Sequence, residues 1–325
     1  MSSKLKPIDI NALTLLSNSL TPGVFCGNQN PTVIPTPKQI QVMTTLLVHP
    51  LLTTRASDEN KHLGIPSVSF TILQNILDTV GSMNASLPEI FVFERPAACR
   101  NAHRRQNPDE DVEGDSESSG PEIDIGGAVA QNGLWTCAQD FWHIVGWSFN
   151  CSVRYPKRWQ YWKVLLDYLL TVLDQDWDER NAVDEELFQS KLETDPEAKI
   201  EYKTVRGSLL VKWLSHCKHD SKAMKRVVSA AFADGSAMNL RDFPEVFENE
   251  TKEFKEVQLG QKRKRGEEIK SLGDYDEEDM MDLDSSETED KSEHDQQDYS
   301  SPLGGSEAVA LRQYLLMLVS IPINL

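Results

Sequence analysis

The sequence predicts an all-α protein, an irregular array of helical hairpins with a disordered acidic insertion and a disordered acidic tail. The hairpins could form a HEAT- or armadillo-like solenoid or a globular helical bundle. Apolar residues recur at helical spacing in most of the chain outside the two acidic segments. No convincing run of alternating apolar and polar residues, with turn pairs such as Asn-Gly, indicates strand hairpins. No repeat of fixed length can be aligned, which disfavours the regular repeat families.

Residues 1–96 are predicted to form an N-terminal helical hairpin region. The pair Thr36-Pro37 indicates a helix start, because a Thr hydroxyl can cap free N–H groups and proline is tolerated at the first helical position. The helix that follows is expected to end at His49-Pro50. A second helix is expected over residues 67–80, so that the two helices form a hairpin.

Aromatic residues concentrate in the next helical region, 134–258, which is predicted to hold the core. Six of the seven tryptophans lie between residues 134 and 178, where one helix is expected before Tyr155-Pro156 and another after it. The second helix carries an apolar stripe that includes Trp159 and Trp162. An indole can bury about 150 Å² or more. Four tryptophans are therefore candidates for the core or for an exposed docking surface: Trp142, Trp159, Trp162 and Trp177.

Further helices are expected over residues 184–192, 202–217, 221–232 and 241–257, the last with a kink at Pro244. Residues 306–325 are predicted to form a short apolar C-terminal helix that packs either on the body of the protein or on a partner.

The charge of the chain is unevenly distributed. The net charge is −18, but residues 109–124 contribute −8 and residues 267–299 contribute −13, which leaves +3 for the rest. Blocks of like charge repel themselves and usually stay disordered. Residues 97–133 are therefore predicted to be a disordered acidic loop, and residues 259–305 a disordered basic and acidic tail.

Cysteine usage and hydropathy indicate a soluble intracellular protein. The five cysteines are widely spaced without a Cys-x-x-Cys pair, and the N-terminal residues do not resemble a signal peptide. No apolar stretch approaches the ~20 residues that span a bilayer. Four consecutive bases fit the short basic motif of nuclear import, and we expect the protein in the nucleus: Lys262, Arg263, Lys264 and Arg265. The alternative is a chance cluster on a solvated linker.

The acidic tail is expected to bind basic proteins such as histones or ribosomal proteins, or else only to keep the chain in solution. Acidophilic kinases prefer acids at positions +1 and +3, as found after Ser286 and Ser292. Ser301 precedes a proline and suits a proline-directed kinase. These three serines are candidate phosphorylation sites.

Sequence motifs for catalysis, cofactor binding and metal binding are missing. The chain has no Walker loop, no Gly-x-Gly-x-x-Gly, no Gly-x-Ser-x-Gly and no His-Glu-x-x-His pattern. His216, Cys217 and His219 have no second cluster at zinc-finger spacing. The acids of residues 174–179 are interpreted as a polar loop at the end of the tryptophan helix, where they would oppose the helix dipole. We therefore expect no catalytic, cofactor or metal site.

The first functional hypothesis is a non-enzymatic nuclear scaffold or adaptor. It would be a subunit of a chromatin, chromosome-maintenance or ribosome-assembly complex, binding protein partners through its helices. The alternative is a nucleic-acid-binding protein that uses the bases and aromatics of residues 154–163 and the bases of residues 218–226. No membrane partner is expected.

Overall fold

Helices provide all the regular secondary structure of the residues that the computed structural model describes, which are 11–18, 34–55, 64–93, 133–197, 199–215, 221–252 and 301–321. No strand occurs in these ranges, and the predicted all-α class is confirmed. They belong to one unit, Met1–Glu253 with Tyr299–Leu325. The predicted insertion 97–133, except for Gly133, lies outside the described residues, as does the predicted tail 259–305 up to residue 300.

The N-terminal hairpin consists of α2 (Pro37–Val48) and α4 (Ile65–Val80), which pack against each other. Helix α2 begins where Thr36-Pro37 predicts, and the Gln39 side chain accepts a hydrogen bond from the Thr36 N–H at 2.8 Å. This contact is the reciprocal half of a capping box. The short elements η2 (Pro50–Leu52) and α5 (Leu87–Ile90) follow the two helices and also contact α2.

The tryptophan-rich region differs from the prediction at two points. The helix expected before Tyr155 is divided into α8 (Leu134–Cys137) and α9 (Phe141–Arg154), because Asp140 takes an extended conformation and caps α9 by accepting from the His143 N–H at 2.7 Å. Helix α10 runs without a break over Pro156–Leu192, so the separate helix expected over residues 184–192 is its last part.

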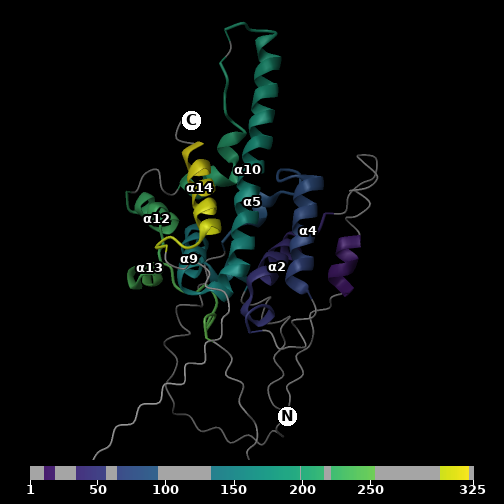
Figure 1. Ribbon diagram of the computed structural model, residues 1–325. Coiled ribbons are helices and arrows are strands. Elements are labelled where there is room, and N and C mark those ends of the chain that lie inside the picture. The colour runs from purple at the N-terminus through teal and green to yellow at the C-terminus, as the bar shows by residue number, and fades with distance from the viewer. Residues whose placement is uncertain are drawn as a thin grey trace, which may run out of the picture. The chain divides into compact units, whose positions relative to one another are not determined.

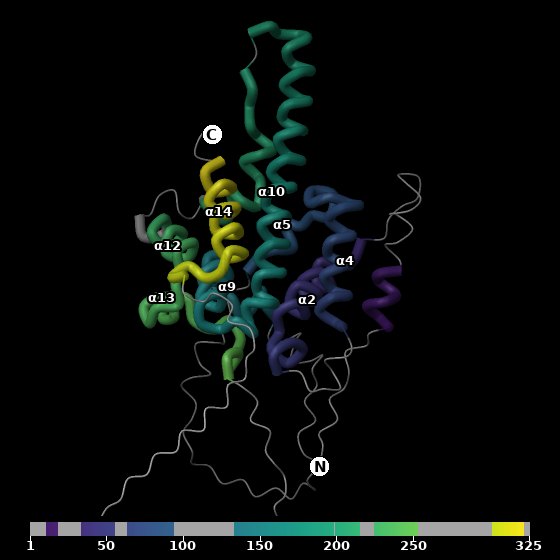
Figure 2. The backbone as a smooth tube through the Cα atoms, in the orientation of Figure 1, coloured from purple at the N-terminus to yellow at the C-terminus, as the bar shows by residue number. Residues whose placement is uncertain are grey.

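Helix α10 is the central element of the bundle. It packs against α9 and α14 (Ser306–Ser320) on one side and α2 on the other, and α11 (Leu209–Ser215) also packs on it (Figure 1). The C-terminal part of α10 extends beyond the neighbouring helices with the segment that returns to η3 (Val205–Gly207), and residues 189–197 there are exposed (Figure 2).

Two short helices and a non-helical segment complete the body. Helices α12 (Ser221–Ala231) and α13 (Ala237–Asp242) pack on α9. The prediction of a helix over residues 241–257 is wrong, because α13 ends at Asp242. Residues 243–252, here called the closing segment, form bends and turns. Phe243 precedes Pro244, and proline disfavours helical geometry in the residue before it; Phe243 has φ −129° and ψ 77°.

Helix α14 packs on its own chain. It lies against α10 and α12 and buries Ala308, Leu315 and Leu318. The apolar C-terminal segment thus adds to the core of the same molecule.

Candidate functional site

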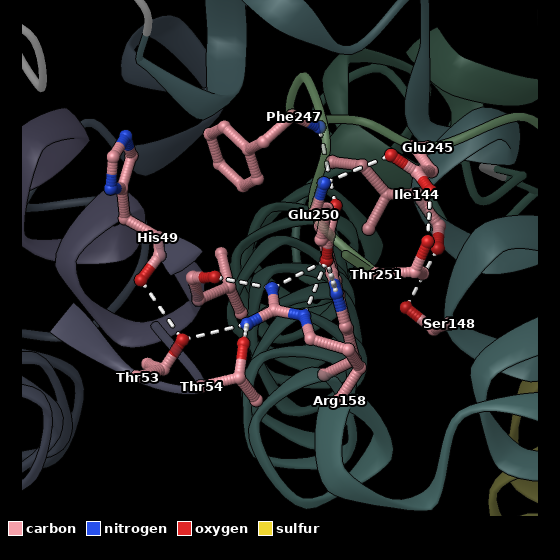
Figure 3. Close-up of polar contacts among 12 residues, drawn as sticks. His49, Thr53, Thr54, Ile144, Ser148, Arg158, Glu245, Phe247, Glu250 and Thr251 are labelled. Atoms are coloured by element: carbon pink, nitrogen blue, oxygen red, sulfur yellow. Dashed lines mark hydrogen bonds and ion pairs between the residues drawn. The ribbon is translucent and has the colours of Figure 1, made fainter. Parts of the chain in front are cut away.

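A buried ion pair joins helix α10 to the closing segment. The Nε of Arg158 donates to Oε1 of Glu250 at 2.7 Å, and its Nη2 donates to the same oxygen (Figure 3). The two side chains are 3% and 0% exposed. A buried charge is costly unless it is paired and hydrogen-bonded, so the remaining contacts of the two side chains determine what the pair can do.

The other donors of Arg158 reach the C-terminal end of α2 and the turn that follows it (Figure 3). Its Nη1 donates to the hydroxyls of Thr53 at 2.6 Å and Thr54 at 3.3 Å, and its Nη2 donates to the Val48 carbonyl at 2.5 Å. A guanidinium has five N–H groups, and all five are accounted for by these acceptors and Glu250. Arg158 therefore has no donor left for a ligand and holds three parts of the chain together.

Glu250 is held equally firmly. Its Oε1 also accepts from the indole Nε1 of Trp162, and its Oε2 accepts from the Phe247 N–H at 3.2 Å. The backbone N–H of Glu250 donates to Glu245 Oε2 at 2.9 Å. The cluster formed by Arg158, Glu250 and Trp162 is thus a structural connection between α10, α2 and the closing segment.

Two histidines of the body are buried. His49 packs edge-on against Phe247, with ring centroids 5.0 Å apart (Figure 3). Burial, with the charges of Arg158 and Arg55, lowers the pKa of His49 to about 4. His143 Nδ1 accepts from the Gln139 N–H at 3.2 Å, so its Nε2 carries the proton and donates to the Pro244 carbonyl at 2.9 Å. Burial also lowers the pKa of His143, so both rings are neutral at pH 7.

The prediction of a polar loop over residues 174–179 is wrong. These acidic residues lie within α10, which continues to Leu192. Asp176 accepts from the Leu209 N–H at the start of α11 at 2.7 Å and from Arg180 Nε at 3.0 Å. Glu179 accepts from the N–H groups of Ser82 at 2.8 Å and Met83 at 2.7 Å. These carboxylates accept hydrogen bonds from backbone N–H groups of neighbouring segments and so connect α10 to them.

The four candidate tryptophans differ little in their burial. Trp162 is 0% exposed, and Trp142, Trp159 and Trp177 are 4%, 9% and 8% exposed. The indole Nε1 of Trp142 donates to the Trp213 carbonyl at 3.4 Å. The structure therefore places all four indoles among core residues.

The basic residues of the nucleic-acid hypothesis are partly engaged within the fold. Arg158 is buried, Arg154 Nε donates to the Gly235 carbonyl at 3.0 Å, and Lys163 pairs with Glu307 at 2.8 Å. Arg226 forms two hydrogen bonds to the Asp140 carboxylate, at 3.0 and 3.2 Å. Trp159 and Trp162 are also buried, so residues 154–163 do not present one exposed basic and aromatic surface. In the stretch 218–226, residues 218–220 and the side chains of residues 221–223 lie outside the described structure.

Most of the proposed signal residues are not covered by the structure. Lys262, Arg263, Lys264, Arg265, Ser286 and Ser292 lie outside the described residues. Ser301 is described: it is half-buried, and its carbonyl accepts from the Gly304 N–H at 3.1 Å. Its modification stays a prediction.

Arg312 anchors helix α14 to the end of helix α12. Its Nη2 donates to the Ala233 carbonyl at 2.7 Å, its Nη1 donates to the Ala231 carbonyl, and its guanidinium lies 3.9 Å from the centroid of the Phe149 ring. Burial lowers the pKa of Arg312 to about 10. A cation at a helix C-terminus is favoured by the helix dipole, which explains how this arginine is tolerated at 3% exposure.

Helix α12 carries an exposed apolar row, here called the α12 stripe. Its members Met224, Val228 and Phe232 are 43%, 51% and 47% exposed. Residues four apart lie on one face of a helix, and the hydrogen bond from the Phe232 N–H to the Val228 carbonyl continues the helical pattern to Phe232. Among the described residues, six of the twelve exposed large hydrophobic side chains lie on α12, α13, α14 or at their ends. The stripe is thus the longest helical row of such side chains in the described residues.

The burial of Arg158 and Glu250 does not follow from the sequence analysis. Arg158 belongs to the basic stretch 154–163 of the nucleic-acid hypothesis, although it lies four residues before Trp162 on the apolar side of the helix, and this spacing is the signal that could place it inside. Glu250 fell in a segment expected to be helical, and no local pattern marks it as buried. In the described ranges, no group of three or more His, Cys, Asp or Glu residues is arranged to hold a metal ion, and no helix is both long and apolar enough to cross a membrane.

Comparison with known proteins gives no relative from which a function could be carried over. No protein-family model, no curated protein and no solved structure matches the chain. The functional proposal therefore rests on the residues of the chain itself.

Proposed function

We propose that the protein is a non-enzymatic nuclear scaffold or adaptor, a subunit of a chromatin, chromosome-maintenance or ribosome-assembly complex. It binds protein partners through its helical body and basic proteins through its acidic tail. The observation that carries the proposal is the α12 stripe, an exposed row of three large apolar side chains on a helix that is anchored to the core. Contiguous exposed apolar surface marks sites of protein association.

The hydrogen bonds of four buried or partly buried charged side chains support a scaffold. Arg158, Glu250, Asp176 and Glu179 each bond to other parts of the fold. Each of these side chains bonds to a segment other than its own helix turn, so its hydrogen-bonding groups connect parts of the fold. Such connections favour a rigid body on which a partner can dock.

The contacts among the helices favour the globular bundle over the solenoid. In a solenoid each repeat contacts its sequence neighbours. Here α10 packs against α2, which lies more than a hundred residues earlier, and against α14, which lies more than a hundred residues later. A body held together by such distant contacts presents its surface helices in fixed positions.

The assignment to the nucleus rests on the sequence Lys262-Arg263-Lys264-Arg265, which lies outside the described residues. The binding of basic proteins rests on the −13 charge of residues 267–299. The nuclear location and the binding of basic proteins can each be tested independently of partner binding by the α12 stripe.

Affinity purification of the tagged full chain tests the proposal. Proteins recovered with the wild type are compared with those recovered with Met224→Glu/Val228→Glu. The matched control is Leu187→Glu/Leu192→Glu, which places the same charges on exposed apolar positions of α10. We expect the wild type and the control to retain the same partners, and the α12 variant to lose at least one of them. Identical partner sets for all three chains would contradict the proposal.

A further inference from the structure

The α12 stripe has the dimensions of a helix-binding surface. Its first and last residues, Met224 and Phe232, are eight residues apart, which corresponds to about 12 Å at 1.5 Å per residue. An amphipathic helix that docks on such a surface contributes apolar residues at i, i+3 or i+4, and i+7. The stripe therefore matches about two turns of a partner helix in length.

The charged residues on α12 are all basic. Its sequence, SKAMKRVVSAA, contains Lys222, Lys225 and Arg226 and no acid. Arg226 is bound to Asp140 and lies 5.0 Å from the centroid of the Phe243 ring. Lys225 is exposed and has no ion pair among the described residues. It lies three residues before Val228, so the two side chains are neighbours on the helix surface.

The neighbouring helix α14 also carries exposed apolar side chains. Glu307 and Tyr314 bond to Lys163 and Asp174 of α10, whereas Arg312 reaches the end of α12. Leu316 follows Arg312 by one turn and is 40% exposed, so it lies on the flank of α14 that is directed toward α12. Methionine is flexible and adapts to differently shaped partners, and Met224 and Met317 bring this property to both helices.

We propose that the α12 stripe binds an acidic amphipathic helix of a partner protein, an inference that rests on the proposed function as a scaffold. Apolar side chains of the partner helix cover Met224, Val228 and Phe232. Carboxylates beside them lie near Lys225. Basic residues beside an apolar binding surface favour acidic partners by charge complementarity and increase the rate of association.

The test uses the full chain and three synthetic fluorescent peptides, each about five helical turns long. The first is an amphipathic helix with leucines on one face and glutamates on the flanks. The second has the same leucines with lysines in place of the glutamates. The third has the composition of the first in scrambled order. Fluorescence anisotropy gives the dissociation constant of each peptide.

We expect the acidic helix to bind, and the lysine and scrambled peptides to bind at least about tenfold more weakly, which corresponds to about 1.4 kcal/mol. Val228→Glu is expected to weaken the acidic helix by a similar factor, since Val228 lies at the centre of the stripe. Lys225→Glu is expected to weaken it and to reduce its dependence on salt concentration. Leu187→Glu and Lys38→Glu, at exposed positions of α10 and α2, serve as matched controls and should leave binding unchanged.

Equal binding of the acidic and lysine peptides, or acidic binding that Val228→Glu and Lys225→Glu leave unchanged, would overturn the inference. No detectable binding of the acidic helix would overturn it as well. If these results were obtained while Met224→Glu/Val228→Glu still lost cellular partners, the scaffold function would stand and only the partner class would be wrong. A single-stranded oligonucleotide that bound the wild type but not Lys225→Glu would favour the nucleic-acid alternative instead.

Discussion

Arg158 and Glu250, 92 positions apart in the sequence, meet in a fully buried ion pair in which two nitrogens of the guanidinium donate to one carboxylate oxygen. The pair lies where the C-terminal end of α2 with the turn after it, the start of α10 and the closing segment meet (Figure 3). Three segments that are distant in sequence thus depend on one charged contact. This dependence predicts a specific cost when one partner is removed.

Glu250→Ala should lower the free energy of unfolding by roughly 3–5 kcal/mol, because it leaves the buried charge of Arg158 unpaired. The matched control is Glu307→Gln, which breaks the exposed pair with Lys163 and should cost about 1 kcal/mol or less. Denaturant unfolding of the two purified variants gives both values. Equal stability losses for Glu250→Ala and Glu307→Gln would show that the buried pair does not connect the three segments.

Gly146→Ala should destabilise the protein although alanine favours helices. A Cβ at Gly146 would lie 2.3 Å from the Phe243 ring, so the closing segment would have to move. Overpacking of this kind typically costs 1–3 kcal/mol. Gly305→Ala, where an added Cβ meets no atom within 4 Å, is the control and should cost less than about 1 kcal/mol. Thermal melting compares the two variants, and a Gly146→Ala protein as stable as the control would exclude the close approach of α9 and Phe243.

The depressed pKa of His49 predicts that stability falls in acid. The folded state holds the pKa at about 4, below the 6.5 of the free side chain, so the unfolded chain binds the extra proton. The stability contributed by neutral His49 is fully present above pH 6.5 and is lost as the pH falls toward 4. The expected loss is about 2 kcal/mol by pH 5. His49→Gln should remove this part of the pH dependence in denaturant unfolding measured above and below pH 6.5. A variant with the pH dependence of the wild type would assign the effect to other groups.

Replacement of Lys262, Arg263, Lys264 and Arg265 by alanine should move a fluorescent fusion of the full chain from the nucleus to the cytoplasm, because an import receptor reads the four bases as an extended peptide. The control replaces Arg104 and Arg105, a pair of adjacent bases without the four-base motif, and should leave the signal nuclear. An unchanged nuclear signal in the first variant would refute the motif as the import signal.

Local sequence patterns located most of the helices but not the contacts that join them. Thr36-Pro37 predicts the start of α2 correctly, since the capping geometry depends on adjacent residues. The sequence predicts too short a helix in place of α10, because the acids of residues 174–179 indicate a polar loop at a helix end. In the structure Asp176 and Glu179 lie within the helix and bond to backbone N–H groups of distant segments. Glu250 could not be located in advance for the same reason: its partners lie about 90 positions away. The exposure of the α12 stripe could not be predicted either. An amphipathic pattern shows where apolar residues lie on a helix but not which of its faces a neighbouring helix covers.

The most direct test of the account compares Trp162→Ala with Met224→Glu/Val228→Glu in both thermal melting and recovery of cellular partners. Trp162 is 0% exposed and bonds to Glu250, so its truncation should cost roughly 3–5 kcal/mol and lower the melting temperature by many degrees. The α12 variant changes exposed side chains, so it should melt close to the wild type and lose partners. A Trp162→Ala protein that melts like the wild type but loses its partners would place the docking surface on the tryptophan helix and contradict the assignment to α12.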